Sequence, residues 1–200
     1  MNIISITENQ VEIIAKSIES ATLRRSNYLA AIPPELSKIE DEIQFKLSNE
    51  NASPRSKIRK IYNLMRELGN VAEPYVACGK GCSSCCKMNV TISQIEANNI
   101  AEKLGIKTKQ LTISHNHNLN EFIGVPCIFL KEDSCTIYDM RPFVCRKHIW
   151  FDKSAYWCDP IRSLDVEMPM IGFSGAEGAF FEITKRNSGG VHADIRDFFT

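Results

Sequence analysis

Half of the cysteines of this 200-residue chain fall in one short run, Cys78-Gly-Lys-Gly-Cys82-Ser-Ser-Cys85-Cys86. The spacing of this run is C-x3-C-x2-C-C, with two glycines among the thiols. The remaining four cysteines all follow it: Cys127, Cys135, Cys145 and Cys158. A set clustered in this way calls for a common purpose, which is disulfide formation, thiol catalysis or metal binding.

The expected compartment argues against disulfides. The sequence begins with no basic leader, no apolar core of signal-peptide length and no small-residue cleavage site, so we expect a cytoplasmic protein. In a reducing cytosol structural disulfides are rare, and clustered cysteines more often bind metal. The adjacent pair Cys85-Cys86 would also make a poor disulfide. Metal binding is therefore the favoured interpretation, and disulfides or redox switching are the alternative.

Composition and charge exclude several other classes of protein. Apolar residues make up 44% of the chain and charged residues 24%, which is typical of a folded protein and not of a disordered one. Lys and Arg together number 24, as do Asp and Glu, so the net charge is zero and we expect no nucleic-acid partner. No apolar run is long enough for a membrane span, and we expect a soluble protein.

Residues 1–70 contain no cysteine and their apolar spacing predicts helices. Thr7 and Gln10 form a capping-box pattern at the start of the first helix. Pro33-Pro34 ends this helix and begins the second, and Ser53-Pro54 begins a third, which Gly69 is expected to end. These helices could form a partner-binding arm, but packing against the cysteine region is the favoured interpretation.

A fourth helix is expected directly after the cysteine run. Val90-Thr-Ile92 has the composition of an extended segment, and Ser93-Gln-Ile-Glu96 is a capping box. Apolar residues continue at helical spacing until Gly105, which is expected to end the helix. The polar stretch 106–124 that follows holds His115-Asn-His117. These two histidines could ligate a metal, but a solvated loop is the favoured interpretation.

A hairpin is expected around Lys131-Glu-Asp-Ser134, because extended segments containing Cys127 and Cys135 lie on either side of it. This hairpin would bring the two thiols close together. Asp139 is expected to cap a short helix that carries Cys145. Beyond Pro160 the chain is rich in turn-forming residues, and the pairs Phe180-Phe181 and Phe198-Phe199 are expected to fill the core.

The spacing of the cysteines indicates how they could share metal. Cys82-x2-Cys85 lets two thiolates bind one ion from a single turn of backbone, and Cys78 could add a third. Adjacent side chains diverge, so Cys85 and Cys86 fit best if they face two metals or different corners of one cluster. The distal cysteines 127, 135 and 145 can complete the coordination. Such a sulfur environment suits zinc or an iron–sulfur cluster.

Four consecutive blocks of this sequence resemble the YkgJ-type cysteine-cluster proteins, the CxxCxxCC family of zinc- or iron-chelating domains. The blocks are the cysteine run, Pro126-Cys127-Ile-Phe-Leu130, Cys135-Thr-Ile-Tyr138 and Arg141-Pro142-Phe-Val-Cys145-Arg146. The resemblance covers about residues 74–160 and implies metal binding. The C-x3-C opening differs from the C-x2-C of the family name, so the resemblance assigns Cys82, Cys85 and Cys86 more directly than Cys78. A related cluster occurs in flagellin lysine methylases, which implies an enzymatic alternative.

For four further residues of this region the sequence leaves two possible roles open. Arg141 and Arg146 could compensate the charge of a thiolate cluster or form surface ion pairs. His148 could be a ligand, although a packed or solvated histidine is favoured. Cys158, outside the four blocks, could be a ligand or a buried thiol.

The predicted fold is α+β and helix-rich, with an N-terminal helical segment at 1–70, a small metal-stabilised cysteine domain with short strands at 71–160, and a C-terminal tail at 161–200 that packs on the core. We expect a metal-binding protein that chelates zinc or an iron–sulfur cluster in a structural or electron-transfer role. The alternatives are an enzyme that uses the cluster, such as a protein lysine methyltransferase-like or redox enzyme, and a cysteine redox sensor. The predicted ligands are Cys78, Cys82, Cys85, Cys86, Cys127, Cys135 and Cys145.

Overall fold

The computed structural model of the protein describes residues 8–164 and 166–199. Within them the chain forms seven α-helices and two antiparallel two-stranded sheets, which confirms the predicted helix-rich α+β class. The helices are α1 Glu8–Ala31, α2 Pro34–Asn49, α3 Pro54–Ala72, α4 Gln94–Leu104, α5 Phe143–Lys147, α6 Ser174–Ser188 and α7 Ile195–Phe198. The strands are β1 Thr91–Ser93, β2 Leu130–Lys131, β3 Ser134–Cys135 and β4 His192–Asp194.

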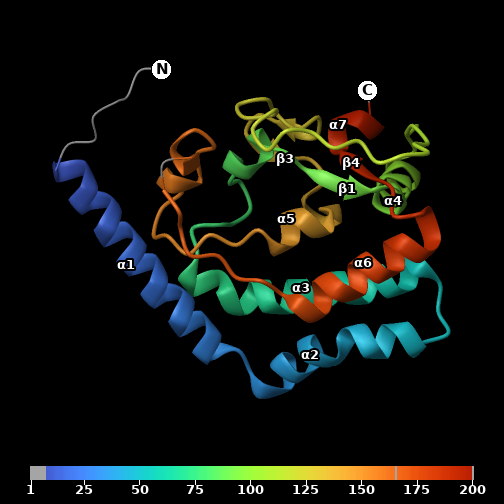
Figure 1. Ribbon diagram of the computed structural model, residues 1–200, viewed down its shortest axis with the longest axis horizontal. Helices are drawn as coiled ribbons and strands as arrows, with labels where there is room; N and C mark the ends of the chain where they lie inside the picture. Colours follow the sequence, from blue (N-terminus) through green and yellow to red (C-terminus); the bar gives the residue numbers. More distant parts are fainter. Residues whose placement is uncertain (1–7, 165, 200) are drawn as a thin grey trace.

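The helices α2, α3 and α6 pack against one another and form a layer below the cysteine region in Figure 1. Pro33 and Pro34 separate α1 from α2, as predicted, and Ser53 caps α3 by accepting a hydrogen bond from the Ser56 N–H at 3.2 Å. The expected end of α3 at Gly69 is wrong, because the helix continues to Ala72. Leu68 and Ala72 are both buried there, so packing extends the helix past the glycine.

The helix α6 was not expected, since the glycine-rich stretch 172–178 indicated turns. The helix forms because it packs closely against α2. The Glu40 carboxylate of α2 accepts hydrogen bonds from the N–H groups of Gly175 and Ala176 at 2.8 and 3.0 Å. A Cβ atom at Gly175 would lie 1.8 Å from the Glu40 carbonyl oxygen. The glycine is therefore a point of helix contact and not a turn.

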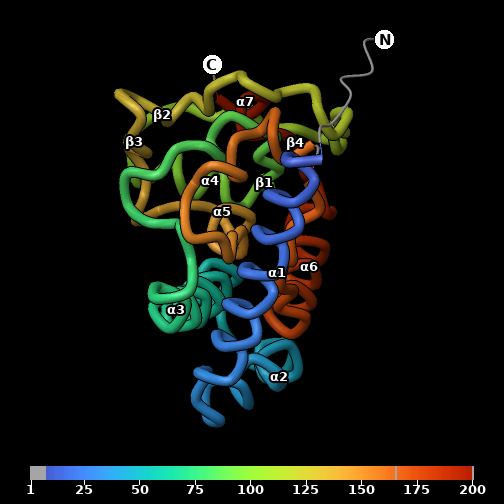
Figure 2. The backbone as a smooth tube through the Cα atoms, turned by 90° about the vertical axis from the view of Figure 1, so that its left-hand side faces the viewer, coloured from blue at the N-terminus to red at the C-terminus, as the bar shows by residue number. Residues whose placement is uncertain are grey.

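The helix α1 attaches to the rest of the molecule through its second half. Tyr28 is fully buried, and its ring centroid lies 5.5 Å from that of Phe151. Arg24 donates hydrogen bonds to the carbonyl oxygens of Pro74 and Tyr75, just before the cysteine run. Figure 2 shows α1 running along the side of the molecule. Of the predicted capping box at its start, Thr7 lies outside the described residues.

The helix α4 begins and ends as predicted. The Ser93 hydroxyl accepts the Glu96 N–H, the Glu96 carboxylate accepts the Ser93 N–H, and Gly105 ends the helix with a φ of 66°. The same carboxylate also accepts the Tyr62 hydroxyl at 2.5 Å and the Phe143 N–H at 2.7 Å. This one buried side chain thus joins α4 to α3 and α5.

Long-range strand pairing closes the upper part of the fold. The strand β1 pairs with β4, about a hundred residues later, in the register Ile92 with Ala193. Asp194 then caps α7 in a second capping box. Phe198 and Phe199 are buried there as predicted, and so is Phe180, whereas Phe181 is 60% exposed and that part of the prediction is wrong.

The predicted hairpin is present as β2 and β3, with Leu130 opposite Cys135. Its two-residue turn, Glu132-Asp133, has positive φ at both positions, as a turn that matches the twist of a hairpin requires. The expected helix cap at Asp139 is wrong. Asp139 lies inside a 3₁₀ turn, and α5 starts at Phe143 after Pro142, whose missing N–H suits a helix start.

Two hydrophobic clusters hold the described residues together. The first combines residues of α1, α2, α3 and α6 with Phe143, Trp150, Phe151 and Cys158. The second combines residues of β1, α4, β4 and α7 with Cys127 and Phe129. The N-terminal helices therefore pack on the cysteine region, as favoured over a free arm, while the domain boundaries at 70 and 160 stay a prediction. Among the described residues, no helix is both long and apolar enough to cross a membrane.

Candidate metal centre

The cysteine run forms two tight turns in succession. Gly81 has a φ of 95°, which favours glycine, and the Cys82 N–H donates to the Gly79 carbonyl at 3.1 Å. A 3₁₀ turn, Ser84–Lys87, then carries Cys85 and Cys86, and the Cys86 N–H donates back to the Ser83 carbonyl. The two adjacent cysteines therefore lie in one turn, and a hydrogen bond joins their thiols.

The first cysteine group consists of Cys86, Cys127, Cys135 and Cys145. The Cys127 N–H donates to the Cys86 carbonyl at 2.6 Å, so the run and the segment before the hairpin lie side by side. The strand β3 supplies Cys135 and the helix α5 supplies Cys145. All four side chains belong to or pack against the second hydrophobic cluster.

The thiols of the first group are close enough to change one another's pKa. Burial and then the neighbouring thiols Cys86, Cys127 and Cys135 raise the pKa of Cys145. The hydrogen bond with Cys86, followed by burial, raises the pKa of Cys135. The pKa of Cys86 reaches about 12: its hydrogen bond with Cys135 lowers the value, but the hydrogen bond to Cys85, burial and nearby thiols outweigh it. Together the four sites disfavour unpaired thiolate charge, which a bound cation would compensate.

The second cysteine group consists of Cys78, Cys82, Cys85 and Cys158. A hydrogen bond joins the thiols of Cys78 and Cys158, and it lowers the pKa of Cys78 to about 7 while it raises that of Cys158. The thiols of Cys82 and Cys85 also act on Cys158 electrostatically. Cys158 and Cys78 both lie at the first hydrophobic cluster. The sequence left Cys158 between two interpretations, and the structure places it among the predicted ligands.

The two groups meet at Cys85 and Cys86, whose side chains are hydrogen-bonded. Arg141 lies near both groups, since its positive charge lowers the pKa of Cys78, Cys135 and Cys145. Its guanidinium group stacks on the Tyr138 ring at 3.6 Å and donates to the Tyr138 carbonyl. This position favours charge compensation over a surface ion pair.

Arg146 has a different role, because it holds the backbone of the preceding segment. Its guanidinium group donates to the carbonyl oxygens of Arg141 and Asp139 at 2.7 and 2.8 Å, and it lies 4.4 Å from the centre of the Tyr62 ring. These bonds fix the segment that leads into α5 and so fix the position of Cys145.

Three backbone N–H groups donate hydrogen bonds to cysteine sulfur atoms. They come from Trp150 to Cys78, from Phe129 to Cys127 and from Ile137 to Cys135. Each lowers the pKa of the thiol that accepts it. Such bonds stabilise thiolate ligands and adjust the properties of the metal that they bind. They are present in both cysteine groups.

All eight cysteines are free thiols in the structure. Among the described residues, no three cysteine sulfurs lie within 4.8 Å of one another. A tetrahedral zinc site with Zn–S bonds of about 2.3 Å would bring its sulfurs to about 3.8 Å apart, so each group must contract to hold one zinc ion. The wider spacing of a polynuclear cluster needs less contraction.

A cleft of about 520 Å³ reaches both cysteine groups from the surface. Cys78, Arg141, Cys145 and His148 are among the residues that line it. His148 is largely buried, which lowers its pKa, and its ring lies 6.0 Å from that of Trp150. It packs against an aromatic side chain, in line with the favoured interpretation, and it faces the same cleft as the thiols.

The polar stretch 106–124 forms a loop, as expected, but its two histidines differ. His115 is exposed, whereas the side chain of His117 is only 11% exposed and contacts Asp197 and Glu121. The hydrogen bond to Asp197, with that to Glu121, raises the pKa of His117. The sequence offered no signal for Asp197, because α7 lies about eighty residues further along the chain.

Comparison with protein families gives one match, over residues 77–160, to the model described as "CxxCxxCC: Putative zinc- or iron-chelating domain". The matched stretch contains all eight cysteines and both groups. It supports metal binding by this region. Comparisons with curated proteins and with solved structures gave no match.

Proposed function

With residues 77–160 matching a zinc- or iron-chelating domain, we propose that this protein holds metal at two four-cysteine centres, as zinc or as iron–sulfur clusters. One centre uses Cys86, Cys127, Cys135 and Cys145, and the other uses Cys78, Cys82, Cys85 and Cys158. The seven ligands that the sequence predicted are thus divided between two centres, and Cys158 is added as an eighth ligand. The centres serve a structural or an electron-transfer role, according to which metal they hold.

The division of the adjacent pair Cys85-Cys86 carries this proposal. Cys85 acts electrostatically on Cys158 and Cys86 acts on Cys145, while the hydrogen bond between the Cys85 and Cys86 thiols is where the two groups meet. The first group lies at the second hydrophobic cluster, and Cys78 and Cys158 of the second group lie at the first hydrophobic cluster. Adjacent side chains cannot easily serve as two corners of one tetrahedral ion. Two separate four-sulfur sites remove this difficulty, and four thiolates are the ligand set that both zinc and iron–sulfur clusters use.

Electrostatics and hydrogen bonding support the same division. Hydrogen bonds between the thiols, burial and, to a smaller extent, the charge of neighbouring thiols raise the pKa values of Cys86, Cys135 and Cys145, so these sites disfavour thiolate charge without a cation. A bound metal deprotonates its thiol ligands and compensates their charge. The N–H···S bonds and the Arg141 guanidinium group then stabilise the negative charge that remains.

Metal analysis of single variants of the full chain, purified without oxygen, tests the proposal. Cys145→Ser should lose the metal of the first centre and Cys82→Ser that of the second, so each should retain about half of the wild-type content, because serine is a poor ligand for soft metals. Ser84→Ala, in the same run, is the matched control. If either cysteine variant loses all metal, one shared centre exists, and if both retain all of it, the cysteines do not bind metal.

The colour of the same preparations separates the two kinds of centre. Iron–sulfur clusters give a brown protein with a broad visible absorption that a reductant bleaches, which supports electron transfer. A colourless protein with two equivalents of zinc has structural centres, since zinc has no redox chemistry.

A cysteine redox sensor is a second candidate, favoured by the hydrogen bond between Cys158 and Cys78, the latter of which lines the cleft. Hydrogen peroxide would oxidise the Cys78 thiol to a sulfenic acid with release of water, and attack by the Cys158 thiol would release a second water and form a disulfide. Mass spectrometry of unreduced peptides from peroxide-treated protein tests this candidate. A Cys78–Cys158 disulfide supports it, and intact thiols at both positions exclude it.

A further inference from the structure

A metal-ligand set that contains no cysteine lies where the loop 106–124 meets the C-terminal segment. Backbone hydrogen bonds hold this loop in place. The His115 N–H donates to the His192 carbonyl at 3.0 Å, and the His192 N–H donates to the Ser114 hydroxyl at 3.1 Å. Further back, the Lys109 N–H donates to the Phe198 carbonyl at 2.9 Å. The loop is thereby fixed beside β4 and α7.

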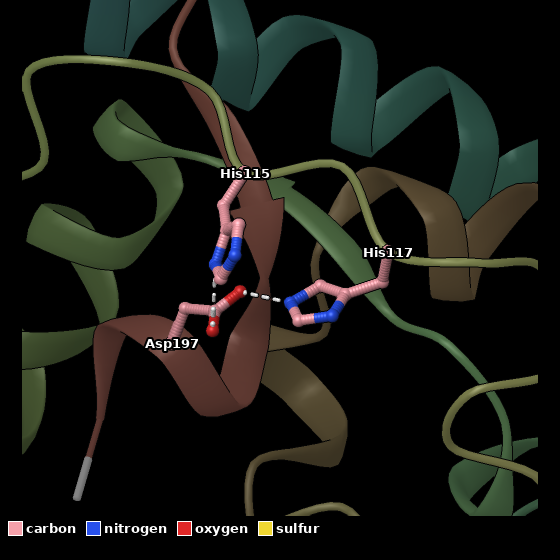
Figure 3. Close-up of side chains that lie close together, drawn as sticks. All are labelled: His115, His117 and Asp197. Carbon is pink, nitrogen blue, oxygen red and sulfur yellow. Dashed lines mark hydrogen bonds and ion pairs between the residues drawn. The ribbon is translucent and has the colours of Figure 1, made fainter.

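Three side chains converge at this junction, as Figure 3 shows. The Asp197 carboxylate lies between two imidazole rings, with one oxygen 3.2 Å from His115 Nδ1 and the other 2.7 Å from His117 Nε2. One ligand atom from each residue can be chosen so that all three lie within 4.8 Å of one another. Among the described residues, this is the one group of three or more histidine, cysteine, aspartate or glutamate side chains whose ligand atoms lie this close together.

A fourth residue orients the set. The Glu121 carboxylate lies 2.7 Å from Nδ1 of His117, the ring nitrogen that faces away from Asp197. Glu121 is itself held by the Asn118 N–H, and the His117 ring packs edge-on against Phe122. Metal-binding histidines commonly donate their second N–H to a carboxylate in this manner, which fixes the ring and directs the other nitrogen at the ion.

We propose that His115, His117 and Asp197 bind a divalent first-row transition-metal ion, such as zinc or ferrous iron, independently of the cysteines. Two imidazoles and one carboxylate are a ligand set that such ions accept, and they leave coordination positions for water. The exposed side of His115 gives solvent access to these positions. On binding, each histidine would replace its contact with Asp197 by a bond to the ion, and the protons between them would be released.

This ion would join the loop 106–124 to α7, whose residues Ile195 and Phe198 belong to the second hydrophobic cluster. A ligand that binds only the folded state raises the midpoint of thermal unfolding. An ion-pair network without metal is the competing explanation, since Asp197 also accepts the Asp194 N–H at 3.1 Å within the capping box of α7. The experiment below separates the two.

The test is a Zn²⁺ titration of the full chain, reduced and with its cysteine-bound metal already measured. Calorimetry counts the added equivalents, and NMR follows the imidazole resonances of His115 and His117. We expect one equivalent beyond the cysteine-bound metal, with both imidazoles perturbed. Because the imidazoles report the site directly, the result does not depend on whether the cysteine centres exist.

Variants identify the ligands. His115→Ala is the primary variant, because its ring is exposed and its loss should leave the folded protein intact; we expect the additional zinc equivalent to disappear. Glu121→Gln should weaken zinc binding by about 10- to 100-fold through the loss of orientation. His192→Ala and Asn116→Ala are matched controls, the first a nearby histidine outside the set and the second a loop residue between the two ligands.

Two results would overturn the proposal. In one, the wild type shows no zinc-dependent change of the His115 and His117 resonances at millimolar Zn²⁺. In the other, folded His115→Ala binds the additional equivalent as tightly as His192→Ala does. Either outcome leaves the cluster as an ion-pair network that holds α7.

Discussion

The buried side chain of Glu96 connects α4 to α3 and α5. Its two carboxylate oxygens accept four hydrogen bonds, two from Ser93 and one each from Tyr62 and Phe143, in a buried position. All four of these groups are hydrogen-bond donors, so a carboxylate, which only accepts hydrogen bonds, can satisfy all of them. Because Phe143 is the first residue of α5, this carboxylate also helps to place Cys145.

The variant Glu96→Gln tests this role. Its amide NH₂ group must face at least one donor, so we expect a loss of about 1–3 kcal/mol in the free energy of unfolding, measured with urea. The matched control is Glu102→Gln on the same helix, whose ion pair with Arg55 is exposed. The control should change stability by less than about 1 kcal/mol. Equal effects of the two variants would show that the buried network is unimportant.

Arg141 is the second residue with effects at several sites, since its charge acts on thiols of both cysteine groups. Arg141→Gln should weaken metal retention in both centres by about 10- to 100-fold, the usual range for residues that support metal ligands. Competition with a chromogenic chelator measures this. Arg162→Gln is the control, because Arg162 also stacks on a tyrosine ring, Tyr156. If both variants retain metal equally, Arg141 does not compensate thiolate charge.

At the scale of elements, the contact between α2 and α6 depends on small residues. The Glu40 backbone carbonyl and the Gln44 side chain occupy the space that a Cβ atom at Gly175 or Gly178 would need. The two helices thereby approach closely, and Glu40 satisfies the first N–H groups of α6. The same contact supports the first hydrophobic cluster, where Cys158 lies.

Two glycine-to-alanine variants make a matched pair at this scale. Gly175→Ala should destabilise the protein by about 1–3 kcal/mol, because the new methyl group collides with backbone that cannot move alone. Gly69→Ala, inside α3 with nothing within 4 Å, should instead stabilise it by about 0.5–1 kcal/mol through helix propensity. Thermal unfolding measures both. A neutral Gly175→Ala would mean that α6 is not in close contact with α2.

At the scale of the whole molecule, the residues between α4 and α6 contain little regular structure. The strands β2 and β3 have two residues each, and α5 has five. Backbone hydrogen bonds and a small core therefore supply little of the stability of this part, and bound metal would supply the remainder. The layer of α2, α3 and α6 has its own extensive apolar contacts.

Removal of metal should consequently affect the molecule unevenly. We expect a strong chelator, under reducing conditions, to increase hydrogen exchange throughout residues 78–158 while α2 and α3 keep most of their protection. Hydrogen exchange read by mass spectrometry measures this by segment. Reductant without chelator is the control and should change nothing. If reductant alone unfolds residues 78–158, disulfides and not metal hold them.

Features that depend on neighbours in sequence could be predicted from the sequence. The helix α4 has its capping box and its final glycine within the thirteen residues from Ser93 to Gly105, so its bounds follow from local hydrogen bonds. The hairpin around Glu132-Asp133 is equally local. The cysteine spacing indicated metal chemistry, which the description of the matched family supports. That Cys85 and Cys86 serve different metals stays a prediction.

Features that depend on distant contacts were decided only by the tertiary structure. The helix α6 forms because its glycine-rich start packs on α2 and is capped by Glu40, which lies more than a hundred residues earlier in the chain. Cys158 joins Cys78, and Asp197 joins His115 and His117, across about eighty residues in each case. No local pattern encodes such meetings, since they follow from the packing of whole elements. The sequence determined which residues could bind metal, and the tertiary structure decided which of them come together.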